Sequence, residues 1–232
     1  MSAAQAAGPR VDARYPSLPY VAPFAVFIAF LALEWMLPLD IETLYPIRVG
    51  VVLAVLVTAS RNVIDFRVNN ALGSILLGTA VFVIWVAPDV LWPAYRSHWL
   101  FTNAITGEAR STAPESVRSS LLFVIFRSVG CVLLVPVIEE LFWRGWLARW
   151  LIDHDFRRVP LGAFTAMSFW VGSLLFASEH GPFWDVGLLA GIAYNWWVRR
   201  TRNLANCILA HAVTNGCLTV YVLMAGQWQY WL

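Results

Sequence analysis

The chain contains no lysine, and all sixteen of its basic residues are arginine. Charged residues of any kind make up only 13% of its 232 positions, whereas roughly 25% is typical of a soluble domain. Hydrophobic residues make up 59%, and the mean hydropathy is +0.65. This composition excludes an ordinary soluble globular protein and indicates an integral membrane protein. A net charge of +2 gives no indication of a nucleic-acid partner.

Cysteine is also scarce. The three cysteines, Cys131, Cys207 and Cys217, lie in apolar runs without CxxC spacing, so we interpret them as small core residues rather than as a disulfide framework or a zinc site. No Gly/Ser-rich linker, low-complexity tract or fixed-period repeat divides the chain. We therefore expect one integral membrane domain over residues 20–232, preceded by a flexible N-terminal segment at 1–19.

Long apolar runs recur along the sequence, and each crossing of a bilayer needs about 20 such residues. The first run is followed by Glu34 rather than by a small-residue cleavage site, so we expect it to be retained as a span. The predicted fold class is all-α, a polytopic membrane helix bundle of about seven transmembrane helices. The predicted spans are 20–37, 46–60, 71–88, 120–150, 161–179, 183–198 and 204–224.

Arginine is distributed unevenly between the connections. It gathers before the first predicted span and after the second, fourth and sixth, whereas the other connections hold fewer. Because positively charged residues stay on the cytoplasmic side, this pattern predicts a cytoplasmic N-terminus and a C-terminus outside. We expect a multi-pass protein of the cell inner (cytoplasmic) membrane. The long connection at 89–116 is then extracytoplasmic.

Several polar and ionisable residues lie inside or beside the predicted spans. Such groups cost free energy at membrane depth and are functional candidates, because they usually face a cavity or a partner. Of these, we expect Glu179 and Arg127 to be interfacial. The full set is Glu34, Arg127, Glu139, Glu140, Arg144, Glu179, His180, His211 and Asn215.

The fourth predicted span contains two adjacent carboxylates. Glu140 and Arg144 are four residues apart, so on a helix they share a face and can form an ion pair. Such a pair on its own could simply hold the end of a helix. Glu139 points about 100° away from its neighbour and has no basic residue three or four positions later. This spacing is typical of one free base beside one supporting carboxylate.

Two further motifs place a histidine on a helix face with a second residue. Phe176 and His180 share a face at the end of the fifth span, and His211 and Asn215 share one in the last span. A glutamate and one histidine could activate a water molecule. The other histidine and Asn215 could donate hydrogen bonds to the oxyanion that forms when this water attacks an amide carbonyl. This chemistry is hydrolysis of a peptide bond at membrane depth, in an intramembrane cavity.

A metal site is the competing interpretation, because two histidines and a glutamate can bind zinc. However, the HExxH spacing of zinc proteases is absent, and Arg144 would oppose a bound cation.

To act together, the motif residues must lie at the same depth in the membrane, and the span limits given above do not place them so. A fourth span over 127–150 that bends at Pro136, with a fifth span starting near Ala166, would bring them together.

The three motifs EExxxR, FxxxH and HxxxN occur in this order over residues 120–224. In this respect the chain resembles the CPBP family (CAAX protease and bacteriocin-processing, also called ABI). Its second half, with GLLAGIAYNWWVRRTRNLANCILAHAVTN and the C-terminal AGQWQYW, looks like the bacterial CAAX prenyl protease-related subgroup. The resemblance implies a glutamic intramembrane endopeptidase that needs no metal or other cofactor. It implies these roles: Glu139 as the water-activating base with His180 beside it, Glu140 and Arg144 as support, His211 and Asn215 as the oxyanion site, and Phe176 packed nearby.

The resemblance also implies partners, namely the lipid bilayer and a membrane-associated protein or peptide substrate. Some members of the subgroup accompany exosortase and PEP-CTERM sorting systems, so a link to such a system is expected. The 89–116 loop is least like the family and could gate the site or recognise a partner. Two other functions remain open: a non-catalytic membrane scaffold or immunity protein that binds a peptide, and a small transporter. The duplicated halves that inverted-repeat transporters show are absent from the sequence.

Overall fold

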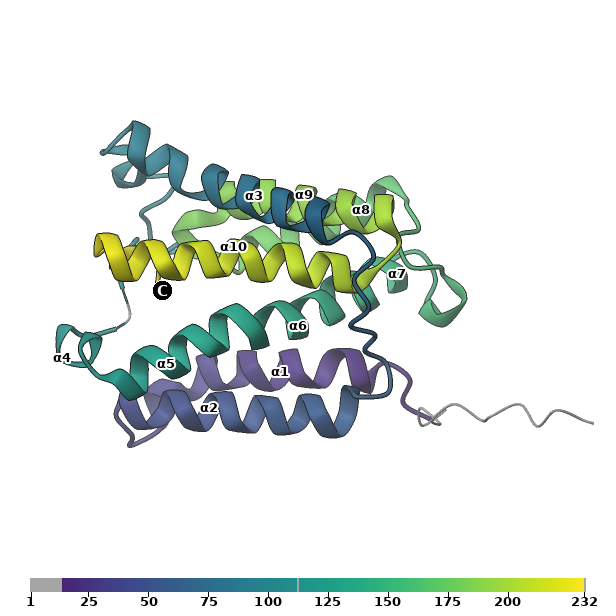
Figure 1. Cartoon of the computed structure of the whole chain (residues 1–232), viewed down its shortest axis with the longest axis horizontal. Coiled ribbons are helices and arrows are strands. Elements are labelled where there is room, and N and C mark those ends of the chain that lie inside the picture. Colours follow the sequence, from purple (N-terminus) through teal and green to yellow (C-terminus); the bar gives the residue numbers. More distant parts are fainter. Residues whose placement is uncertain (1–13, 112, 232) are drawn as a thin grey trace, which may run out of the picture.

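The computed structural model describes residues 14–111 and 113–231, and these residues form an all-α bundle (Figure 1). The predicted flexible segment at 1–19 lies largely outside the described residues. The α-helices are α1 Leu18–Leu33, α2 Ile41–Val55, α3 Ala71–Leu91, α4 Glu115–Arg118, α5 Leu121–Val129, α6 Val135–Glu140, α7 Ala148–Trp150, α8 Ala166–Ser178, α9 Trp184–Thr201 and α10 Leu204–Ala225. Short 3₁₀ turns are η1 Glu34–Met36, η3 Tyr95–Ser97, η6 Phe156–Arg158, η7 Gly181–Phe183 and η8 Trp228–Tyr230, and π turns are η2 Leu56–Ser60, η4 Gly130–Leu134 and η5 Leu141–Leu147.

Five of the helical stretches are long and apolar enough to cross a membrane, so the chain is a multi-pass membrane protein. They are Leu18–Met36, Ile41–Ser60, Ala71–Leu91, Leu121–Trp150 and Leu204–Ala225. In the most apolar part of α3 only 17% of the residues are buried within the protein. The remaining apolar surface therefore requires a non-aqueous environment, which lipid provides.

The predicted fifth and sixth spans are not among these five candidates. The fifth is reduced to α8, whose 13 residues extend for only about 20 Å, less than the ~30 Å of a bilayer core. A capping box at Thr165 and Ser168 starts this helix at Ala166, as predicted from the need for a common depth. The sixth corresponds to α9, whose 18 residues include charges at both ends, Asp185 in the first turn and Arg199 in the last.

α10 occupies the centre of the bundle, between α3 on one side and the helix that runs from α5 to α7 on the other (Figure 1). The contact with α3 is close because Gly78 has no side chain there. Thr214 of α10 donates a hydrogen bond to the Gly78 carbonyl at 2.8 Å. At the end of the same interface, the Asn206 side-chain oxygen accepts hydrogen bonds from the backbone N–H groups of Asn69 and Asn70, both at 3.1 Å. These contacts fix the register of α10, which carries two of the predicted site residues.

Replacing Gly78 by alanine is expected to destabilise the bundle. A Cβ atom at this position would lie 2.3 Å from the Ala210 carbonyl oxygen, so α3 and α10 would have to separate, at a cost of roughly 1–3 kcal/mol. Gly50 of α2 has nothing within 4 Å of its Cβ position and provides the control, because Gly50→Ala should leave stability unchanged or slightly higher. Unfolding of both purified variants in detergent would measure the difference, and equal stability would contradict this account of the interface.

The connection at 89–116 is attached to the bundle through Arg96. This side chain is buried and donates to Asp89 at 3.0 Å, to the Pro182 carbonyl at 2.7 Å and to Asp185 of α9. Tyr230 donates to the other oxygen of Asp89 at 2.8 Å. The loop therefore packs against the start of α9 and the C-terminal segment.

Candidate functional site

The helix that carries the two adjacent glutamates is wider than a regular α-helix at two places. Residues Leu121–Trp150 form one continuous helical stretch of 30 residues. Within it, the π turn η4 precedes α6 and the π turn η5 begins directly after Glu140. Turns of this kind are rare in proteins overall, but where they occur they often lie at functional sites. They occur on either side of Glu139 and Glu140, near the predicted bend at Pro136.

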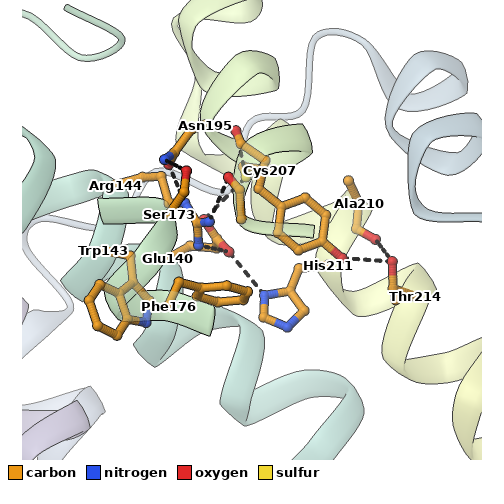
Figure 2. A network of polar contacts seen from close by, with 12 residues as sticks. Glu140, Trp143, Arg144, Ser173, Phe176, Asn195, Cys207, Ala210, His211 and Thr214 are labelled. Carbon is orange, nitrogen blue, oxygen red and sulfur yellow. Dashed lines mark hydrogen bonds and ion pairs between the residues drawn. The ribbon is translucent and has the colours of Figure 1, made fainter. Parts of the chain in front are cut away.

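Glu140 is the centre of a buried hydrogen-bond network (Figure 2). Its side chain is 0% exposed, and one of its oxygens accepts from Arg144 at 3.0 Å and from His211 at 2.9 Å. The other oxygen accepts from the Cys207 thiol at 3.1 Å. A buried carboxylate is tolerated only when it is paired and hydrogen-bonded in this way. Glu140 therefore connects α6 to α10 through a fully buried side chain.

Arg144 extends the same network to α8 and α9. It is 2% exposed and donates to the Asn195 side-chain oxygen at 2.9 Å and to the Gly191 carbonyl at 3.3 Å. Asn195 in turn donates to Ser173 of α8 at 2.9 Å. The guanidinium carbon lies 4.5 Å from the centre of the Phe176 ring, a cation–π arrangement. Arg144 is thus fixed from several sides and balances the charge of Glu140.

His211 lies between this network and two aromatic rings. Its ring stacks on Tyr194 at 5.0 Å and meets the edge of Phe176 at 6.1 Å. An ionised carboxylate can only accept, so the Nδ1 atom of His211 carries the proton that is donated to Glu140. The orientation of the ring is therefore fixed, with Nε2 directed away from Glu140 (Figure 2).

Glu139 has a different environment from its neighbour. Its side chain is 7% exposed, and its Oε2 atom is buried without a hydrogen-bond partner among the described residues. It lies on the wall of a cavity of about 240 Å³. Phe176, His180 and Asn215 line the same cavity. The structure thus brings three of the six proposed catalytic residues to one cavity, whereas Glu140, Arg144 and His211 are not among the residues that line it.

His180 and Asn215 are each held by one backbone carbonyl. The Nδ1 atom of His180 lies 2.7 Å from the Phe176 carbonyl oxygen, which can only accept, so Nδ1 carries a proton. In the neutral ring Nε2 is then left as a hydrogen-bond acceptor. The Asn215 amide nitrogen donates to the Cys131 carbonyl at 2.9 Å.

Some site residues were not predicted from the sequence, or were predicted to lie elsewhere. Glu179 and Arg127, expected at the interface, both line the cavity. Trp143 donates to Glu179 at 3.1 Å. Cys207, expected to be only a small core residue, also donates to Glu140, and Asn195 belongs to no motif. The adjacency of Glu179 to His180 was the one signal that could have indicated its position.

Glu34, another of the candidate residues, accepts a hydrogen bond from Arg48 at 3.2 Å. Within residues 14–111 and 113–231, no three His, Cys, Asp or Glu side chains are grouped so that they could hold a metal ion. The expectation that the site needs no metal stays a prediction.

Comparison with known proteins gives one match. The sequence model of the Rce1-like family, described as Type II CAAX prenyl endopeptidase Rce1-like, matches residues 119–217. This segment is therefore an Rce1-like domain of the CPBP family, a family of CAAX-type intramembrane proteases, and the predicted resemblance is confirmed. The match includes every predicted site residue. No curated protein and no solved structure matches the chain.

Proposed function

We propose that the protein is a metal-independent glutamic endopeptidase that hydrolyses a peptide bond of a membrane-associated protein or peptide. The observation that carries this proposal is Glu139. Its Oε2 atom is buried without a partner on the wall of a cavity that His180 and Asn215 also line. A carboxylate in such a position costs free energy unless it has a ligand or a chemical task.

The first step is attack by water on the scissile carbonyl. Glu139 takes a proton from the water as the water oxygen bonds to the carbonyl carbon, and the carbonyl π electrons move to the oxygen. His180 accepts a hydrogen bond from the same water at Nε2, because its Nδ1 proton is held by the Phe176 carbonyl. When the C–N bond breaks, the proton passes from Glu139 to the leaving amine. Glu139 is thereby restored, and the products are a carboxyl group and an amine.

The oxyanion formed in this step needs hydrogen-bond donors. Asn215 supplies its second N–H, because only one of the two is used by the Cys131 carbonyl. His211 does not itself line the cavity, so this role requires that the oxyanion reach its Nε2 atom and that Nε2 also carry a proton, as in the imidazolium form. Glu140, 2.9 Å away, stabilises that cation. Each well-placed donor contributes roughly 3 kcal/mol to the transition state.

The remaining predictions on location are part of the same proposal. Arginine-bearing connections, including 61–70 and 151–165, lie at the end of the bundle where α1 begins (Figure 1). This arrangement supports a cytoplasmic N-terminus in the inner membrane, with the 89–116 loop outside. The family match supports a protein or peptide substrate. It gives no support for a link to an exosortase system.

A comparison of protein termini tests the proposed activity. Membranes of the native host carrying the wild-type protein or Glu139→Ala, at equal levels, should differ, with new termini only in the wild-type sample. The cut sequences would identify the substrate. Identical termini in the two samples, with the variant folded and inserted, would favour a non-catalytic peptide-binding protein, which a pull-down with both proteins would then detect.

A further inference from the structure

The π turn before Glu139 leaves one backbone carbonyl without a helical partner. The backbone N–H of Val135 donates to the Gly130 carbonyl, five residues earlier. The next donor in this register would be residue 136, which would reach Cys131. This residue is Pro136, which has no N–H. The Cys131 carbonyl therefore receives no hydrogen bond from its own helix, although buried carbonyls are nearly always paired.

The partner of this carbonyl comes from another helix. The Asn215 amide nitrogen on α10 donates to Cys131 at 2.9 Å. The contact determines how the amide lies: its nitrogen must face Cys131, because a carbonyl oxygen cannot donate. Without it, the amide of a half-buried asparagine could rotate about its last bond and present either atom to the cavity. The contact thus fixes which groups of Asn215 the cavity receives.

We propose that Pro136 is a positioning residue, which keeps the Cys131 carbonyl free so that this carbonyl orients the Asn215 amide toward the cavity. The proposal rests on the proposed function, in which Asn215 donates to the oxyanion. Pro136 touches neither the substrate nor the water. Its contribution is a missing hydrogen-bond donor on the helix that also carries Glu139.

Pro136→Ala restores the missing N–H. If the π turn persists, residue 136 donates to Cys131; if the turn tightens to a regular α-helix, Val135 donates to Cys131 instead. In either register the carbonyl gains a partner within its own helix, and this new donor competes with Asn215 for the acceptor. Because an alanine is a better helix former than a proline, the variant is expected to fold.

A kinetic double-mutant cycle tests the coupling, with the peptide that spans the cut site found by the comparison of termini. Pro136→Ala should lower kcat by about 10- to 100-fold with KM unchanged. A misplaced oxyanion donor weakens stabilisation of the transition state but not binding of the substrate. In the Asn215→Ala background the same change should have no further effect. Pro46→Ala, which removes a proline inside α2, should leave kcat unchanged. A Pro136→Ala effect that multiplies with that of Asn215→Ala would overturn the proposal.

A second measurement needs no substrate. In protein labelled with ¹⁵N-asparagine, the side-chain N–H signal of Asn215, assigned by its loss in Asn215→Ala, should shift and exchange faster with solvent in Pro136→Ala. An unchanged signal would overturn the inference even if the enzyme were active. A shifted signal together with fully active Asn215→Ala would instead support the coupling and contradict the oxyanion role of Asn215. Failure of the positioning role of Pro136 and failure of the oxyanion role of Asn215 therefore give different results.

Discussion

Glu139→Gln is expected to lower the cleavage rate by roughly 10³-fold, within the range that a general base contributes. Glutamine has nearly the same shape as glutamate but cannot take a proton from water. Folding should not suffer, because Oε2 of Glu139 has no hydrogen-bond partner to lose among the described residues. The measurement is the rate of cleavage of the identified peptide by purified protein in lipid vesicles, together with thermal unfolding of both proteins.

Glu179→Gln is the matched control, because Glu179 is a second carboxylate on the wall of the same cavity. One of its oxygens accepts from Trp143 at 3.1 Å, and a glutamine oxygen can accept that hydrogen bond equally well. We expect a rate loss of less than about tenfold, since a positioned hydrogen bond is kept and no proton transfer is removed. If Glu179→Gln abolished cleavage and Glu139→Gln did not, the base would be Glu179.

Local spacing explains why part of the site could be predicted from the sequence. Glu140 and Arg144 are four residues apart on one helix, and their ion pair at 3.0 Å follows from that separation. Glu139 has no basic residue at such a distance, and its Oε2 atom has no partner among the described residues. The roles assigned to these residues in catalysis stay predictions.

Contacts between distant segments could not be predicted in this way. His211 is 71 residues from Glu140, and Asn195 is 51 residues from Arg144. Neither separation leaves a periodic signal, because the contacts depend on how whole helices pack. The split of Glu139 toward a cavity and Glu140 toward the protein interior is likewise a consequence of packing against α8, α9 and α10.

Five of the seven predicted spans correspond to helices long and apolar enough to cross a membrane, and the fifth and sixth do not. The predicted fifth span began at residue 161, but the capping box at Thr165 starts the helix later and the 3₁₀ turn at Gly181 follows its end. The shorter α8 has a physical consequence for the site. Helix α8 is only about 20 Å long and so ends partway along the bundle. His180, which follows the end of the helix, therefore lines the cavity.

Glu140→Leu is expected to cost about 3–5 kcal/mol of stability, the usual effect of breaking a buried ion pair. The reason is the charge that remains. Arg144 is only 2% exposed, and without Glu140 it would be left as a buried cation without its carboxylate. The Cys207 thiol and His211 would lose their acceptor at the same time. Chemical unfolding in mixed micelles would measure the change.

Two controls separate this effect from a general loss of charge. Asp65→Asn breaks an arginine pair in which both side chains are exposed, 90% for Arg67 and 58% for Asp65, and should leave stability unchanged. The double variant Glu140→Leu/Arg144→Leu removes both charges and should be more stable than Glu140→Leu alone, because no uncompensated charge remains. If the double variant were instead as unstable as the sum of the single changes, the loss would come from packing and not from the buried charge. Glu140 would then contribute to stability mainly through packing, and another contact would have to position His211.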